Sequence, residues 1–418
     1  MVFKKLLLTG TAKDSFFVLG GAGATAVFGF LLTVLLTRNL NQVDFGLVVT
    51  ALAFSQLVID LSEFGINSAI LAYLPKYQNL SQAILIKTSG ILRLFIGIVM
   101  GCIVFIFAQL IAEKVFGSLQ MVPYIQVSVI GIVLAGYITW GQTIMQSLGR
   151  FAESAMLNGV VSISRVLGIT LLMVLGIVSA LNSYIATQLV VIVPLIYIIY
   201  RFRKQLSSSP FNSTEAVKTL KFGLPLGLSF AVAAISTRLD QLLVFNLLSE
   251  EDAGFYGLSF RMAMLLVFVS SAIGAAITPR FASLEPSDFG RYFKKSLLAV
   301  ALLALGTLIL IPAGQVVIPL LFGREYSESI VPFQLLVVGM SIFILQVPFN
   351  LGIIYFFKKT HYSVFLSIGT LVLMWFGLNA FIPVYKITGA ALTVVLVYIF
   401  QLIVMSLYFV YLLRKSKV

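Results

Sequence analysis

Charged residues are scarce in this chain, and so are the residues that build disulfides and metal centres. Only 10% of the 418 residues are charged and 60% are hydrophobic, whereas a soluble domain carries roughly a quarter charged residues. One cysteine, Cys102, and one histidine, His361, exclude a disulfide framework and a cysteine metal site. There is no Gly-Lys-Ser/Thr phosphate loop and no Ser/His/Asp arrangement. We therefore expect no enzyme, no metal and no cofactor.

Long apolar stretches dominate the remainder of the chain. They recur at about 20 residues each, which suffices to cross roughly 30 Å of hydrocarbon as a helix. Helices satisfy their own backbone, as lipid requires. We predict an all-α polytopic membrane protein with about 12 transmembrane helices. The predicted spans are 15–37, 45–73, 88–111, 121–147, 155–178, 182–200, 219–248, 254–279, 294–320, 330–356, 362–382 and 388–413.

The net charge of +13 does not form a nucleic-acid patch, because the basic residues lie at the ends of spans. If the N-terminus is cytoplasmic, the cytoplasmic segments hold 20 of the 28 Lys and Arg residues and the outer loops hold four. An excess of this size on one side is the positive-inside signal. We expect a multi-pass membrane protein with both termini cytoplasmic.

Two short repeats suggest a duplicated six-span unit. Three residues of the first outer loop recur 208 positions later: Leu40, Asp44 and Gly46 as Leu248, Asp252 and Gly254. Phe116-Gly117 recurs 206 positions later as Phe322-Gly323. We predict two six-helix lobes, residues 1–200 and 219–418, related by a parallel pseudo-two-fold axis and joined by a basic cytoplasmic linker, 201–218. Transporters built this way have their site between repeats.

Seven ionisable side chains lie inside predicted spans. A charge at a helix centre costs ~2.5–3.5 kcal/mol on the insertion scale, so these residues should face a water-filled cavity or one another. They are Asp60, Glu63, Arg93, Arg165, Arg238, Asp240 and Arg261. For Arg93, near the end of its span, a side chain that snorkels to the interface is the alternative.

The four arginines indicate an anionic cargo. A guanidinium stays charged when desolvated and gives two parallel hydrogen bonds to phosphate. We predict that Arg93, Arg165, Arg238 and Arg261 bind the substrate. The same arginines could instead pair with the three carboxylates.

The carboxylates are candidates for ion coupling. Asp60 and Glu63 are three positions apart and share a helix face. Two carboxylates close together in a poorly hydrated place do not both ionise readily, which suits a proton or sodium site. The alternative is that they bind arginines or helix ends. Asp240, in span seven, is the third candidate; its neighbour Arg238 points to a nearly opposite face.

Glycines and a proline open span seven. The segment Gly223-Leu224-Pro225-Leu226-Gly227 permits either a bend or a close approach between helices.

Four short motifs, spread over most of the chain, carry a family resemblance. They are Arg38-Asn39-Leu40 with Phe45-Gly46; Glu63-Phe64-Gly65; Asp240-Gln241-Leu242-Leu243 with Ala253-Gly254-Phe255-Tyr256 and Arg261; and Leu321-Phe322-Gly323 with Tyr326. In order and spacing they resemble the polysaccharide-transport branch of the multidrug/oligosaccharidyl-lipid/polysaccharide exporter superfamily, the O-antigen flippase type. Glu63 departs from the family's usual aspartate.

The resemblance implies a two-lobed flippase. Its cargo would be undecaprenyl-pyrophosphate-linked oligosaccharide, moved from the inner to the outer leaflet by alternating access, as an antiporter driven by a proton or sodium gradient. Other membrane proteins of polysaccharide and lipopolysaccharide assembly are the further partners it suggests. One alternative is a cation-coupled multidrug exporter of the same superfamily. A membrane enzyme of polysaccharide polymerisation is another, although no loop is large enough for the outer domain it would need. A scaffold without transport is the third.

Overall fold

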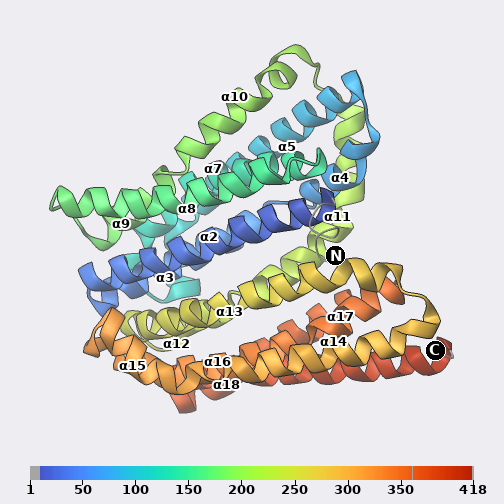
Figure 1. Cartoon of the computed structure of the whole chain (residues 1–418). Coiled ribbons are helices and arrows are strands. Elements are labelled where there is room, and N and C mark those ends of the chain that lie inside the picture. The colour runs from blue at the N-terminus through green and yellow to red at the C-terminus, as the bar shows by residue number, and fades with distance from the viewer. Residues whose placement is uncertain (1–9, 360, 417–418) are drawn as a thin grey trace. The chain divides into compact units, whose positions relative to one another are not determined.

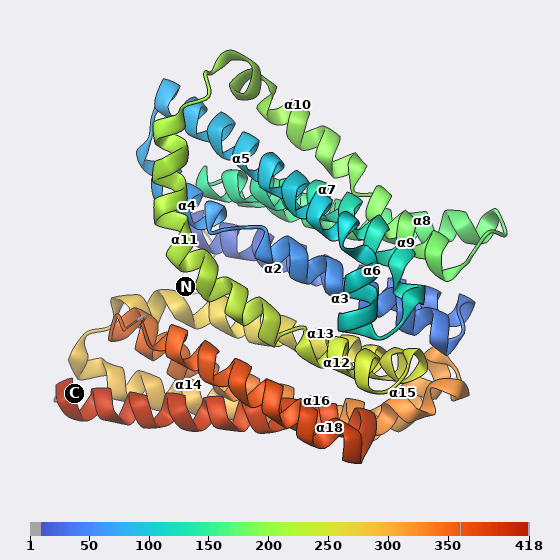
Figure 2. The same cartoon turned by 180° about the vertical axis from the view of Figure 1, so that it is seen from behind.

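The computed structural model describes residues 10–359 and 361–416. These residues form helices joined by short loops, with no strand among them (Figures 1 and 2). The chain divides into two compact units, Met1–Arg238 and Leu239–Val418.

The first unit contains the helices from α2 to α11. Their bounds are α2 Gly10–Asn39, α3 Gln42–Leu61, α4 Ile66–Tyr73, η1 Leu74–Lys76, α5 Asn79–Ile106, α6 Ala108–Ile111, η2 Ala112–Phe116, η3 Leu119–Met121, α7 Val122–Ser147, α8 Phe151–Val174, α9 Ala180–Leu189, α10 Ile192–Ser208 and α11 Ser213–Ser236. Helix α2 packs along α8, and α5 packs along α7. Trp140, Ile144 and Ile198 belong to its main apolar core.

The second unit contains the helices from α12 to α18. Their bounds are α12 Leu239–Leu247, α13 Glu250–Ser283, α14 Pro286–Thr307, α15 Leu310–Phe322, η4 Arg324–Ser329, α16 Ile330–Leu345, α17 Val347–Leu351, η5 Gly352–Phe356 and α18 Tyr362–Ser416. Helix α16 packs on both α13 and α18. Aromatic rings fill one core, where Phe289 stacks on Phe356 with centroids 3.8 Å apart.

The number of membrane crossings follows from the last helix. Eleven helices among the described residues are long and apolar enough to span a membrane, and the last has 54 residues. A straight helix of that length would measure roughly 80 Å, so it cannot cross once. The backbone reverses at Lys386, where φ is 51°, and Gln401 Nε2 in one arm donates to Thr370 Oγ1 in the other at 2.9 Å. With the two arms counted separately, the all-α polytopic fold of about 12 spans is confirmed.

Predicted span two is not one continuous helix. Helix α3 ends at Leu61 and α4 begins at Ile66. Between them, Phe64 and Gly65 have φ angles of 49° and 71°, in the left-handed region that favours glycine. The two segments of this span are therefore free to take different directions.

Helix α11 packs directly on this break. A Cβ atom added to Gly65 would lie 2.0 Å from the carbonyl oxygen of Gly223. One added to Gly227 would lie 2.7 Å from the carbonyl carbon of Phe64. The two α11 glycines thus let backbone meet backbone, which supports the packing interpretation of the motif that opens span seven.

This contact explains why α11 belongs to the first unit. The sequence predicts that the second lobe begins at residue 219, whereas α11 packs on α3, α4 and α5 and belongs to the first unit. The predicted linker, 201–218, is also largely helical, because α10 runs to Ser208 and α11 starts at Ser213. Span seven breaks at Thr237–Arg238, and the second unit starts there. The pseudo-two-fold repeat stays a prediction.

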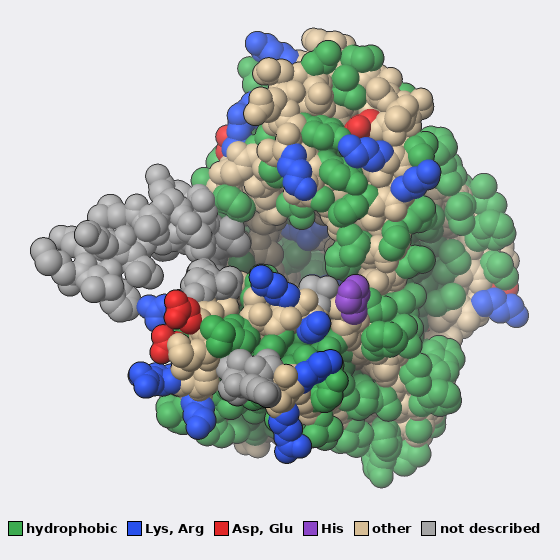
Figure 3. Space-filling model, turned by 90° about the vertical axis from the view of Figure 1, so that its right-hand side faces the viewer, with side chains coloured by type: hydrophobic (Ala, Val, Ile, Leu, Met, Phe, Trp, Pro, Cys, Tyr) green, Lys and Arg blue, Asp and Glu red, His purple; other side chains and the backbone are tan. Residues whose placement is uncertain are grey.

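Basic residues gather at one end of the helices in each unit. The α10–α11 loop lies at that end of the first unit, and the α13–α14 loop at that end of the second (Figure 1). Figure 3 shows one face of the molecule, on which Lys and Arg side chains are scattered among hydrophobic ones, with few acidic residues. The cytoplasmic orientation of this end stays a prediction.

Replacing Gly65 by Ala should destabilise the first unit. A non-glycine residue in the left-handed conformation costs roughly 1–2 kcal/mol, and the added methyl would push α11 away from α4. We expect the melting temperature of the detergent-purified protein to fall by roughly 4 °C or more. Gly29→Ala is the control, because its Cβ would meet no atom within 4 Å. An unchanged melting temperature for Gly65→Ala would contradict the close packing.

Candidate functional site

Arg93, on α5, lies against the break in span two. Its side chain is buried, with 2% of its surface exposed. The guanidinium donates to the carbonyl oxygens of Ser62, Ile59 (3.3 Å) and Gly136 (3.0 Å), and to Ser62 Oγ at 3.2 Å. A break inside a membrane span frees carbonyls that lipid cannot satisfy. Arg93 donates to those of Ile59 and Ser62 at the end of α3, and its buried side chain does not snorkel.

Gly136, on α7, makes room for this guanidinium. A Cβ atom there would lie 2.8 Å from Nη2 of Arg93. Gly136 therefore has two roles: its carbonyl oxygen accepts a hydrogen bond from Arg93, and its missing side chain leaves the space that the guanidinium occupies.

Asp60 and Glu63 stand on either side of the end of α3. Asp60 Oδ1 accepts a hydrogen bond from Gln56 Nε2 at 2.8 Å. Glu63 Oε1 accepts one from the backbone N–H of Asn67 at 3.1 Å, which satisfies a donor in the first turn of α4. Both carboxylates lie in the electrostatic field of Arg93. The structure therefore brings these three predicted site residues together.

Arg165 lies in the middle of α8 and differs from Arg93. Its Nε is buried and has no hydrogen-bond partner among the described residues. No salt bridge joins it to a carboxylate among the described residues, and burial disfavours its charged form. Buried unpaired donors are rare in folded proteins, and each of them requires an explanation.

Arg238 lies at the break in span seven, directly after α11. Its Nε is likewise buried without a partner in the part of the chain that the structure describes. Its charge acts on Asp60. The first unit therefore gathers charged side chains at two interruptions of its helices.

The second unit holds Asp240 in a polar cluster. Asp240 is 2% exposed; its Oδ2 accepts from the Tyr256 hydroxyl at 2.6 Å and its Oδ1 from the backbone N–H of Gln241 at 2.8 Å. Gln241 Nε2 donates to the carbonyl of Ala253 at 3.0 Å, which links α12 to α13. Arg261, on α13, is half-buried.

Two polar groups were not anticipated from the sequence. Tyr256 donates a hydrogen bond to Asp240. It is part of a motif that carries the family resemblance, but that motif predicts no role for it. A second cluster joins Ser55 on α3 to Tyr184 and Gln188 on α9, with Gln188 Nε2 donating to Ser55 Oγ at 3.1 Å. The signal available for it was the four-residue spacing of Tyr184 and Gln188, which places both on one helix face.

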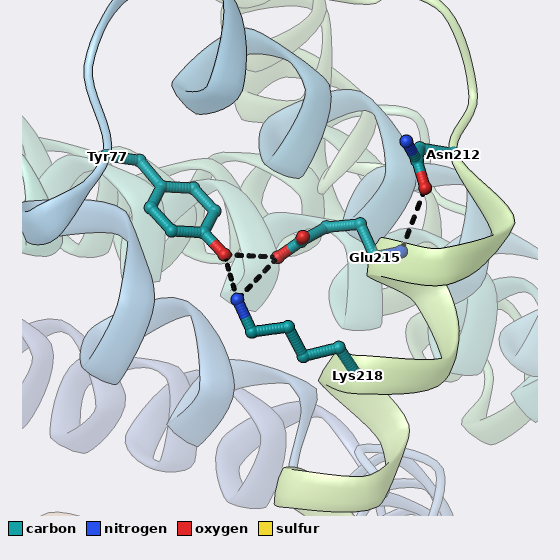
Figure 4. A network of polar contacts seen from close by, with 4 residues as sticks. All are labelled: Tyr77, Asn212, Glu215 and Lys218. Carbon is teal, nitrogen blue, oxygen red and sulfur yellow. Dashed lines mark hydrogen bonds and ion pairs between the residues drawn. The ribbon is translucent and has the colours of Figure 1, made fainter.

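A polar network ties the start of α11 to the end of η1 (Figure 4). The Tyr77 hydroxyl donates to Glu215 Oε1 at 2.8 Å and accepts from the Lys218 ammonium. Lys218 also lies 3.8 Å from Glu215 Oε1 and 4.5 Å from the centroid of the Tyr73 ring. Asn212 Oδ1 caps the helix by accepting from the Glu215 N–H at 3.0 Å. The first half of span seven is thus held to span two at its start and at its glycines.

The arginines among these side chains can neutralise an anion, and the carboxylates can bind a cation at other positions. Arg165 and Arg238 have unused donors suited to phosphate. Asp60, Glu63 and Asp240 are carboxylates at helix interruptions, where transporters commonly bind coupling ions. Whether these residues bind cargo or ions stays a prediction.

Comparison with known proteins agrees with the sequence resemblance. A family model described as a polysaccharide biosynthesis protein matches residues 35–331. A 92-residue stretch is 30% identical to an uncharacterized membrane protein of Methanocaldococcus jannaschii, covering 21% of this chain and 18% of that protein. The match thus spans less than a fifth of the length of this curated relative.

Solved structures share the fold across nearly the whole chain. Lipid II flippase MurJ, in an inward closed conformation, superimposes with a TM-score of 0.77 at 14% identity, over 95% of this chain and 87% of that one. The multidrug transporter DinF-BH has a TM-score of 0.70 at 14% identity, over 98% and 96%. A MOP superfamily transporter from Pyrococcus furiosus has a TM-score of 0.63 at 14% identity, over 98% and 96%. Flippases and drug exporters therefore resemble this chain in fold alike.

Replacing Arg93 by Gln should unfold the protein rather than only disable a site. The change leaves the buried carbonyl of Ser62 without its donor, at a cost of about 1–3 kcal/mol, and removes one of two side-chain donors to the carbonyls of Ile59 and Gly136. We expect a lower melting temperature in detergent and less inserted protein, with Arg93→Lys intermediate because it keeps the charge but loses the planar fork.

The matched control is Arg291→Gln, which removes an exposed arginine from α14. If Arg93→Gln kept its melting temperature but lost transport, Arg93 would belong to the cargo site that the sequence predicts.

Proposed function

The chain belongs to the polysaccharide biosynthesis protein family, and from this membership we propose that it is a flippase for a lipid-linked oligosaccharide. Its cargo is an undecaprenyl-pyrophosphate-linked unit of a surface polysaccharide, such as O-antigen. The protein moves this headgroup from the inner to the outer leaflet of the bacterial inner membrane by alternating access.

The observation that carries the proposal is Arg165, whose Nε is buried in mid-span without a partner among the described residues. A guanidinium in that position is costly unless an anion pairs with it. A pyrophosphate supplies such an anion, with several oxygens in the geometry that arginine binds. Arg238 has the same unpaired nitrogen, and Arg261 is the further intramembrane arginine that we assign to the cargo.

The physical task of a flippase fits these side chains. A headgroup with two phosphates and several sugars cannot cross hydrocarbon unaided, because each unpaired polar group costs several kcal/mol there. Arginines along the path replace the water that the phosphates lose, while the apolar polyprenyl tail stays in lipid. An ion gradient supplies the direction, with Asp60, Glu63 and Asp240 as the coupling carboxylates.

Neutralising Arg165, Arg238 and Arg261 to Gln should block export in the host. Each lost charge-assisted hydrogen bond costs about 1.5–3 kcal/mol, so the triple variant should slow flipping more than tenfold. We expect lipid-linked oligosaccharide to accumulate in the inner leaflet and surface polysaccharide to fall, as in a deletion strain. Both are measured by leaflet-specific labelling and by surface staining.

The control, Arg291→Gln, should restore export when it complements the deletion. Normal surface polysaccharide in the triple variant, with the protein stably inserted, would refute the cargo assignment. If the deletion strain keeps its polysaccharide but becomes sensitive to cationic compounds, the chain is a multidrug exporter with the same fold.

Replacing Asp60 by Asn should uncouple flipping from the ion gradient. An amide does not release a proton and binds sodium far less well than a carboxylate, so an imposed proton or sodium gradient should no longer accelerate flipping in proteoliposomes. Asp288→Asn, at an exposed position at the start of α14, should keep the acceleration. A gradient response retained by Asp60→Asn would remove Asp60 from the coupling site.

A further inference from the structure

A hollow on the outside of the first unit lies between α8 and α10. It is lined by Met156, Leu157 and Val160 from α8 and by Val193 and Pro194 from α10. Its empty volume, with its open side counted, is about 460 Å³. The side chains at its rim face outward, since Met156 is 64% exposed and Val193 is 58% exposed. The hollow therefore opens toward lipid.

Charged groups stand at one end of this hollow. Glu153, which lines it, lies 3.3 Å from Arg201 Nε and 3.8 Å from Arg150 Nη1. All three side chains are about one-third exposed, at 35%, 32% and 38% in that order. Two guanidinium groups share the single carboxylate of Glu153. The three side chains therefore have a net charge of +1, and several N–H donors of the arginines are not used by the carboxylate.

The two ends of the hollow match the two parts of a phospholipid. Glu153 and Val160 are seven residues apart on α8, or roughly 10 Å along the helix axis. The arginines thus stand at the level of headgroups while the apolar lining reaches into hydrocarbon. Arg150 and Arg201 both lie in segments predicted to be cytoplasmic, the side on which basic pockets between membrane helices bind anionic headgroups.

We propose that the α8–α10 groove binds one acyl chain of an anionic diacyl phospholipid, with the lipid phosphate between Arg150 and Arg201. Exposed ion pairs contribute only about 0–1 kcal/mol, so the Glu153 contacts exchange readily for phosphate. The charge left over by the two arginines selects an anionic lipid over a zwitterionic one. This site is separate from Arg165 and does not depend on the cargo.

Quenching by brominated lipids tests the proposal. Met156→Trp places a fluorophore at the rim of the groove, in a Trp375→Phe background because Trp375 is 50% exposed and the other tryptophan, Trp140, is fully buried. The protein is reconstituted with mixtures of phosphatidylcholine and phosphatidylglycerol, one of them brominated in its acyl chains. We expect phosphatidylglycerol to be preferred about fivefold, as one extra basic charge near the surface provides.

Substitutions separate the headgroup from the tail. Arg150→Gln with Arg201→Gln should reduce the preference to about one, whereas Arg291→Gln with Lys294→Gln, the same charge change elsewhere, should leave it intact. Glu153→Gln should raise it, which tests the same contacts without removing an arginine. Val193→Phe fills the groove and should weaken quenching by both lipids.

Three outcomes would overturn the proposal. Equal quenching by the two lipids in the parent protein would mean an ordinary lipid contact. A preference that survives loss of both arginines would place the headgroup elsewhere. Relief of quenching by undecaprenyl phosphate at lower concentration than by phosphatidylglycerol would assign the groove to the cargo tail. None of these outcomes bears on whether the protein flips oligosaccharide.

Discussion

A helix that breaks inside hydrocarbon must find protein partners for every backbone group it frees, and this constraint governs the first unit. The break between α3 and α4 exists because Arg93 reaches the carbonyls of Ile59 and Ser62 from a neighbouring helix. Gly136 gives the guanidinium its space, and the glycines of α11 close over the other side of the break. Removing Arg93 would leave the buried carbonyl of Ser62 unpaired, and a side chain at Gly136, Gly223 or Gly227 would force these groups apart.

The same constraint explains where the charges lie. Charged side chains are tolerated where the helices are interrupted, because the freed backbone and the side chains can satisfy one another. Asp60 and Glu63 stand at the break in span two, and Arg238 and Asp240 stand at the break in span seven. Discontinuous helices with charged groups are the parts from which transporters build their ion sites. The interruptions therefore cost backbone hydrogen bonds, and they also provide positions where charged groups can be accommodated within the membrane.

Features that depend on residues close together in the sequence could be predicted, whereas features that depend on contacts between distant residues could not. Hydrophobic length sets the number of spans, and short motifs carried the family, so the fold class and the family were both predicted. The role of Arg93 was not, since its partners are carbonyls 31, 34 and 43 positions away, and a carbonyl leaves no mark in a sequence. The limit of the first unit was missed for a similar reason: it depends on Gly223 meeting Gly65, a contact between distant glycines.

Fold alone does not decide the cargo, because lipid flippases and multidrug exporters share this architecture. Our proposal of an anionic cargo rests on the sign of the charge that the described residues leave without a partner. Asp60 lies in the field of two arginines, and Asp240 accepts from a tyrosine hydroxyl, so these carboxylates are compensated within the protein. Arg165 has no such compensation among the described residues. A guanidinium that the described residues leave without a partner attracts an anion, and this is why we propose an anionic cargo rather than a cationic drug.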